Sequence, residues 1–122
     1  MGFFKSSYGA LLRLIENNNN CCITSNCITD IYYIIRKLSD RNSALKSNFL
    51  LTGLCDVLEV GESDVLMALN SKINDYEDAI VEAVAYKNNC DYILTCDEKH
   101  YKNSKVNIIT PKEINIKISF NL

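Results

Sequence analysis

The stretch that decides the fold is residues 75–104, DYEDAIVEAVAYKNNCDYILTCDEKHYKNS. Residues 76–88 repeat small apolar side chains at helical spacing, after a start rich in acids. The run DYILT at 91–95 is typical of a buried β-strand, and Asp97 follows just past its end. The stretch therefore predicts a helix and then a strand, with carboxylates at both places where helix and strand meet a loop.

The same alternation of helices and strands extends to both sides of this stretch. Apolar periodicity predicts further helices at 8–16, 26–38, 41–54 and 62–69. β-prone runs predict further strands at 21–25, 55–60 and 106–110, and the tail 114–122 either forms a strand or trails loosely. Alternating strands and helices imply an α/β fold with a mostly parallel sheet. With no linker or internal repeat, we expect one domain over residues 1–122.

Composition restricts the class of protein. The chain has 48% apolar and 23% charged residues, as soluble globular proteins do. No apolar run approaches the roughly 18–20 residues that span a bilayer, and no secretory signal is present, so no membrane partner is expected. The six cysteines form no CxxC pair, and we interpret them as buried structural thiols of a cytoplasmic protein. The net charge of −2 argues against broad coating of nucleic acid, but it allows a nuclease with an acidic metal site.

Three acids are predicted to share one edge of the sheet. In parallel α/β sheets, strand ends and the starts of the following helices lie along the edge where ligands bind. Asp30, Asp78 and Asp97 fall at such positions. Converging carboxylates suit Mg²⁺ or Mn²⁺, which take oxygen ligands.

Each acid also has a purely structural interpretation. Asp30 and Asp78 would complement helix dipoles, and Asp97 would be a turn residue. Asp75 is expected as the N-cap of its helix. Glu82, one turn after Asp78, would either reach the same edge or point to water.

From about residue 8 to 113 the chain resembles a PIN domain, in particular the bacterial group related to VapC ribonucleases. The resemblance depends on an "ED-A" helix start, then "A-DYI-T-D", an aromatic after a basic turn, a "TP-E" close and the upstream ITDIYYIIRK. Matched residue by residue, Asp30, Asp78 and Asp97 correspond to three of the four acids of the PIN site. Thr95 corresponds to the Ser/Thr just before the last acid. His100 departs from the pattern, because this turn position is often acidic in relatives.

The resemblance implies a three-layer PIN-like fold, and it also implies a missing piece. PIN domains begin with a strand that carries a D-x-N motif, whose Asp is the first metal ligand. MGFFKSSYGALL runs directly into the expected first helix, so we expect an N-terminally truncated single domain without the first central strand. The tail strand, a partner chain or direct pairing of the neighbouring strands would fill the gap.

The function implied by the resemblance is metal-dependent hydrolysis of RNA phosphodiesters by the toxin of a toxin–antitoxin pair. Asp78 and Asp97 would bind Mg²⁺ or Mn²⁺, which activates a water for attack on phosphorus. Asp30 would orient that water or support the metal ligands, and Thr95 would position a carboxylate or phosphate. The loop with Lys99, Lys102 and Lys105 would steer phosphate, or be an ordinary solvated loop.

Loss of the first acid predicts weak metal binding and impaired cleavage. One alternative is a catalytically inactive PIN-like protein that retains binding to an antitoxin or forms a homodimer. A second alternative is an unrelated α/β binding module whose acids only cap helices.

Overall fold

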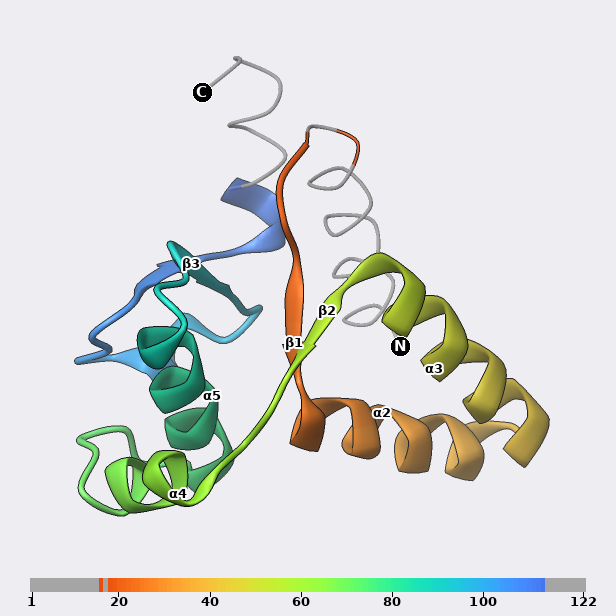
Figure 1. Ribbon diagram of the computed structural model, residues 1–122, viewed down its shortest axis with the longest axis horizontal. Helices are drawn as coiled ribbons and strands as arrows, with labels where there is room; N and C mark the ends of the chain where they lie inside the picture. Colours follow the sequence, from red (N-terminus) through yellow and green to blue (C-terminus); the bar gives the residue numbers. More distant parts are fainter. Residues whose placement is uncertain (1–15, 17, 114–122) are drawn as a thin grey trace. The chain divides into compact units, whose positions relative to one another are not determined.

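The structure is a computed structural model that describes residues 16 and 18–113 (Figure 1). The chain divides into two compact units, one formed by Asn20–Val60, while residues 61–113 belong to the other. Both units combine helices with a pair of parallel strands. The described residues are therefore mixed α/β, as the alternation in the sequence predicts.

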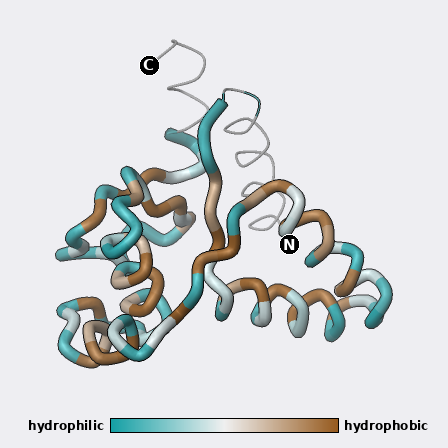
Figure 2. The backbone as a smooth tube through the Cα atoms, in the orientation of Figure 1, coloured by the Kyte–Doolittle hydropathy of each residue, from teal (hydrophilic) through white to brown (hydrophobic). Residues whose placement is uncertain are grey.

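The unit Asn20–Val60 is a parallel strand pair with two helices. Its elements are β1 (Cys22–Thr24), α2 (Ser25–Leu38), α3 (Arg41–Leu54) and β2 (Asp56–Leu58). β1 pairs with β2 so that Cys22 lies opposite Asp56. The helices α2 and α3 pack on each other. Figure 2 shows hydrophobic residues along both helices, interspersed with polar ones.

Side-chain caps explain where these helices begin. Thr24 Oγ1 accepts a hydrogen bond from the Cys27 N–H at 3.4 Å, so α2 begins at Ser25. The Asp40 carboxylate accepts from the Ser43 N–H at 2.7 Å and starts α3. That backbone hydrogen bond lowers the pKa of Asp40 below its usual value.

The second unit contains the stretch that decides the fold. Its described elements are α4 (Glu62–Leu69), α5 (Tyr76–Lys87), β3 (Tyr92–Leu94), the 3₁₀-helix η1 (Glu98–Tyr101) and β4 (Asn107–Ile109). β3 pairs with β4 in parallel, with Tyr92 opposite Asn107. Residues 111–113 are helical, which agrees with a terminal turn at Pro111.

Helix α5 supplies much of the core of this unit. Its small apolar residues allow close packing against α4 and β3, and five of them are buried: Ala79, Ile80, Ala83, Val84 and Ala85. Ile93 of β3 and Ile109 of β4 are also buried. Burying a Val or Ile side chain contributes about 1.5–3 kcal/mol, so this packing fixes α5 against the strand pair.

Two buried carboxylates connect segments of this unit. Asp64 accepts from the Gly61 N–H at 2.8 Å and from Lys87 Nζ at 2.6 Å, which ties α4 to α5. Glu82 accepts from the Ser71 hydroxyl at 3.2 Å and from the Lys105 N–H at 2.9 Å. Glu82 therefore joins two loops, and the interpretation of Glu82 as a solvated acid is wrong because its side chain is buried.

The cysteines differ from the prediction of uniformly buried thiols. Cys55 is buried, whereas Cys22 and Cys96 are exposed. Burial, with a contribution from Cys21, raises the pKa of Cys55 to about 11, so its thiol is protonated and inert at neutral pH. Cys55 thus behaves as the expected structural thiol.

Several predicted elements are only partly represented. The helix predicted at 8–16 lies outside the described residues except for Glu16, and the tail 114–122 lies outside them entirely. Within residues 18–113 the strands form two separate hydrogen-bonded pairs, so one continuous sheet stays a prediction. No helix in this described part is long and apolar enough to cross a membrane.

Candidate functional site

Asp78 lies in the first turn of α5, as predicted. The Asp75 carboxylate accepts from the Asp78 N–H at 3.0 Å, which confirms Asp75 as the N-cap. Capping fixes the start of the helix at Tyr76 and thereby sets the position from which the Asp78 side chain extends.

Asp97 follows β3 and precedes η1. Thr95 Oγ1 accepts a hydrogen bond from the Asp97 N–H at 3.0 Å. The Thr95 N–H donates to the Ile109 carbonyl of β4 at 3.0 Å. Thr95 therefore fixes the backbone that carries Asp97 relative to the strand pair.

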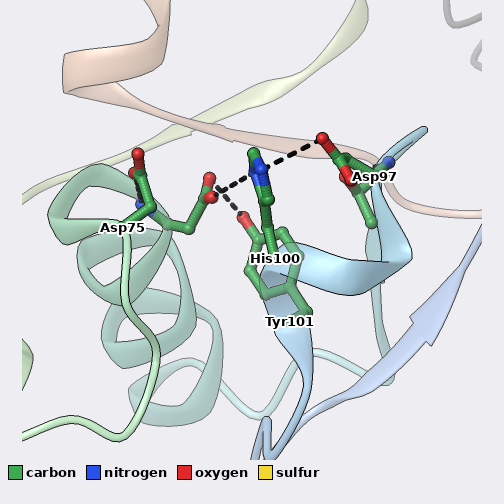
Figure 3. Close-up of polar contacts among 6 residues, drawn as sticks. Asp75, Asp97, His100 and Tyr101 are labelled. Carbon is green, nitrogen blue, oxygen red and sulfur yellow. Dashed lines mark hydrogen bonds and ion pairs between the residues drawn. The ribbon is translucent and has the colours of Figure 1, made fainter.

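His100 connects the two acids (Figure 3). Its Nδ1 lies 3.1 Å from Asp78 Oδ2, and its Nε2 lies 3.1 Å from Asp97 Oδ2. The second carboxylate oxygen of Asp78, Oδ1, accepts a hydrogen bond from Tyr101 Oη at 3.2 Å. Two acids from different elements thus meet at one imidazole ring, while the buried Tyr101 anchors η1.

The environment of Asp78 changes its acidity. Its side chain is 23% exposed. Partial burial, together with the charge of Asp75, raises the pKa of Asp78, although hydrogen bonds from Tyr101 and His100 oppose the rise. A carboxyl with a raised pKa beside other titratable groups is a common feature of functional sites.

The predicted cation needs a ligand set of a different kind. Mg²⁺ requires oxygen ligands at about 2.0–2.1 Å in near-octahedral geometry. Here the ring of His100 stands between the carboxylates of Asp78 and Asp97, with one nitrogen toward each. Among the described residues, no group of three or more His, Cys, Asp or Glu side chains is arranged to hold a metal ion. The site as arranged does not fit the cation.

Asp30 and the acids of α5 belong to different units. Asp30 lies on α2, in the unit Asn20–Val60, and is half-buried. Its participation in the site stays a prediction. Asp78, Asp97 and Thr95 lie in the other unit, where the first two are brought together and the third supports Asp97.

A basic surface pocket adjoins the acids. It has a volume of about 690 Å³ and is lined by Lys72, Asn74, Asp75, Lys99, His100, Lys102 and Asn103. Lys99 and Lys102 were predicted to form a phosphate-steering loop. Lys105 is not among the lining residues, and its Nζ lies 5.7 Å from the centre of the Tyr86 ring. Lys72 was missed because it comes from the loop before α5, distant in sequence from the other two.

Sequence reasoning missed the connecting role of His100 and Tyr101. The available signal was the i, i+3 spacing from Asp97 to the chain's single histidine. On a turn of 3₁₀-helix, residues three apart lie on the same side, so an Asp and a His at that spacing can pair.

The comparisons with known proteins agree with a mixed α/β fold. The family model of the PIN domain matches residues 2–99. The chain therefore belongs to the PIN domain family. It is also similar to Ribonuclease VapC1 of Aquifex aeolicus (strain VF5), with 26% identity over 114 residues, which cover 89% of this chain and 78% of that protein. No solved structure gave a significant match.

Proposed function

We propose that this chain is a VapC-like ribonuclease that acts on RNA phosphodiesters through Asp78 and Asp97. The observation that supports the proposal is the convergence of these two acids on one point, from the start of α5 and the end of β3. Membership of the PIN family and similarity to a VapC ribonuclease support the same reaction class. The three-layer arrangement and the contribution of Asp30 belong to this proposal.

RNA is the proposed substrate because of the pocket beside the acids. Three lysines and two asparagines line it, and such side chains contact phosphate oxygens in nucleic-acid complexes. A backbone phosphate bound there would hold the next phosphodiester near Asp78 and Asp97. The sequence of the RNA would not be read by these contacts, since lysine–phosphate pairs carry no base information.

Cleavage is proposed to depend on Mg²⁺ or Mn²⁺ and to be weak. In the arrangement described, His100 occupies the space between the two acids, and no described cluster completes a ligand set. We therefore derive no catalytic step through the metal. Low activity is expected from this arrangement of the described side chains.

The experiment is cleavage of a fluorescent single-stranded RNA by purified protein with Mn²⁺, at enzyme concentrations high enough to detect slow turnover. Slow cleavage that is lost in Asp97→Asn and Asp78→Asn supports the proposal. The matched control is Asp91→Asn, an exposed acid just before β3, which should cleave like the wild type. Cleavage that persists in Asp97→Asn would not depend on Asp97 and would refute the proposal.

A non-catalytic PIN-like protein that binds a partner is the second candidate. The observation in its favour is the apolar surface of α2 and α3, where Phe49 is 81% exposed and Tyr33, Ile34, Leu38 and Leu50 are at least half exposed. Exposed apolar side chains in this number are typical of protein-binding surfaces. An antitoxin or a second copy of the chain is the proposed partner. Stable dimers in light scattering, together with no RNA cleavage under any metal condition, would favour this candidate.

A further inference from the structure

The contacts of His100 define what kind of group lies between the acids. Both nitrogens of His100 face carboxylate oxygens at 3.1 Å, and an ionised carboxylate only accepts hydrogen bonds. The ring therefore fills the space between the two carboxylates and contacts one oxygen of each.

We propose that the ring of His100 occupies the cation position between Asp78 and Asp97, so that a divalent cation binds there only when the ring moves away. The inference rests on the proposed function in one respect, because it takes these two acids as the metal ligands. It goes further because it assigns a role in metal binding to His100, a residue that is not part of the family pattern. The bridge and the bound metal are mutually exclusive states of the same two carboxylates.

The ring is a competitor for the metal and not one of its ligands. A ligating imidazole must present a nitrogen lone pair to the metal, but each nitrogen of His100 is directed at a carboxylate. Mg²⁺ and Mn²⁺ also favour oxygen ligands over nitrogen. Removal of the ring should consequently strengthen cation binding, whereas removal of a true ligand would weaken it.

The surroundings allow the ring to leave without unfolding. The His100 side chain is 51% exposed, and it lines the open pocket that also contains Lys72 and Lys102. Its neighbour Tyr101 is buried and holds the backbone of η1. A change of side-chain rotamer would thus release both acids while the backbone stays in place, and exposed side chains change rotamer within nanoseconds.

The test measures cation binding directly and needs no cleavage. Mn²⁺ binding is followed by electron paramagnetic resonance of free Mn²⁺ in wild type, His100→Ala and His100→Gln. We expect both variants to bind Mn²⁺ more tightly, by about tenfold for His100→Ala, since two charge-assisted contacts no longer compete. Lys102→Ala is the control for general electrostatics, because it removes a positive charge from the pocket without removing the bridge. It should change the affinity by much less.

A second measurement uses the wild-type protein. His100 is the only histidine, so its ring gives one set of NMR signals that can be followed during titration with diamagnetic Mg²⁺. The inference requires these signals to move as Mg²⁺ binds, and to remain unchanged in the Asp97→Asn protein at the same Mg²⁺ concentrations. This measurement does not depend on whether His100 variants fold.

Three results would overturn the inference. The first is equal or weaker Mn²⁺ binding by His100→Ala, and the second is His100 ring signals that do not shift when Mg²⁺ binds. The third is the absence of cation binding by any of these proteins at millimolar concentrations. Failure of the proposed function is distinguishable. Metal binding that His100 suppresses, without any RNA cleavage, would refute the ribonuclease and keep the inference. Metal-dependent cleavage, together with a cation affinity that His100→Ala leaves unchanged, would refute the inference and keep the proposed ribonuclease.

Discussion

The ammonium of Lys87 lies 2.6 Å from the carboxylate of Asp64, whose side chain is only 1% exposed. The same Oδ2 also accepts from the Gly61 N–H, while Asp64 Oδ1 is buried and has no hydrogen-bond partner among the described residues. Lys87 is therefore the charged partner that compensates the burial of this acid. The pair joins the first turn of α4 to the last turn of α5.

Replacement of Lys87 by Met should destabilise the protein. Methionine keeps most of the apolar stem, but it leaves Asp64 buried with a single backbone donor. We expect a loss of about 2–3 kcal/mol in the free energy of unfolding, below the ~3–5 kcal/mol typical of fully buried pairs because Lys87 is partly exposed. Urea denaturation measures it, and Lys46→Met on the exposed surface of α3 is the control.

The same pair predicts an acid dependence of stability. Burial alone would raise the pKa of Asp64, yet hydrogen bonds from Lys87 and Gly61 hold it below its usual value. Since the folded-state pKa is the lower one, this contribution is present above about pH 4 and is lost as the pH falls through the folded value. The stability difference between wild type and Lys87→Met should shrink on acidification from pH 7 to 3. A difference that stays constant would contradict this assignment.

Glu82→Ala should reduce stability without affecting the acid site directly. The substitution leaves the Ser71 hydroxyl and the Lys105 N–H without their buried acceptor, and each unsatisfied group costs about 1–3 kcal/mol. Thermal unfolding should show a clear decrease in Tm, whereas Glu59→Ala, at an exposed position, should show little. Unchanged Mn²⁺ affinity of the folded Glu82→Ala protein would confirm that Glu82 is not a ligand.

Tyr101→Phe should raise the pKa of Asp78 further. The hydroxyl of Tyr101 donates to Asp78 and opposes the upward shift that burial and Asp75 cause. Its removal favours the protonated carboxyl while the ring continues to fill the core. The side-chain ¹³C signal of Asp78 reports the titration, and Tyr33→Phe is a control on an exposed ring. A lower pKa in Tyr101→Phe would show that the hydroxyl does not stabilise the carboxylate.

Lys72→Ala should weaken RNA binding in a salt-dependent way. Each lost phosphate contact lowers the slope of log affinity against log salt by about 0.7 for single strands. Fluorescence anisotropy in EDTA measures binding without cleavage, and Lys46→Ala should leave the slope unchanged. Equal slopes for wild type and Lys72→Ala would exclude this pocket as a phosphate site.

Much of the fold could be predicted because it depends on local signals. The observed bounds of α3 and α4 match the predicted ranges, and α5 ends one residue earlier than expected. Capping and apolar periodicity act over a few residues and are visible in sequence. The strands are shorter than the predicted runs, because strand ends depend on pairing with segments distant in sequence.

The candidate site could be predicted only in part. Asp78 and Asp97 were identified because the ends of consecutive elements in α/β proteins lie on one edge. The bridge through His100 depends on the 3₁₀ turn of η1, which the sequence did not indicate. The side chains of Glu82 and Asp64 are buried against partners more than ten residues away in sequence, so no local pattern predicts their positions.

Thr95 connects the backbone at Asp97 to strand β4. Its hydroxyl accepts from the Asp97 N–H, while its own N–H donates to the Ile109 carbonyl of β4. The Ile109 side chain is buried, so a change of its size would shift β4 and, through Thr95, the acid. Apolar substitutions at Ile109 therefore offer a way to adjust the separation of the two carboxylates without altering a single charged residue.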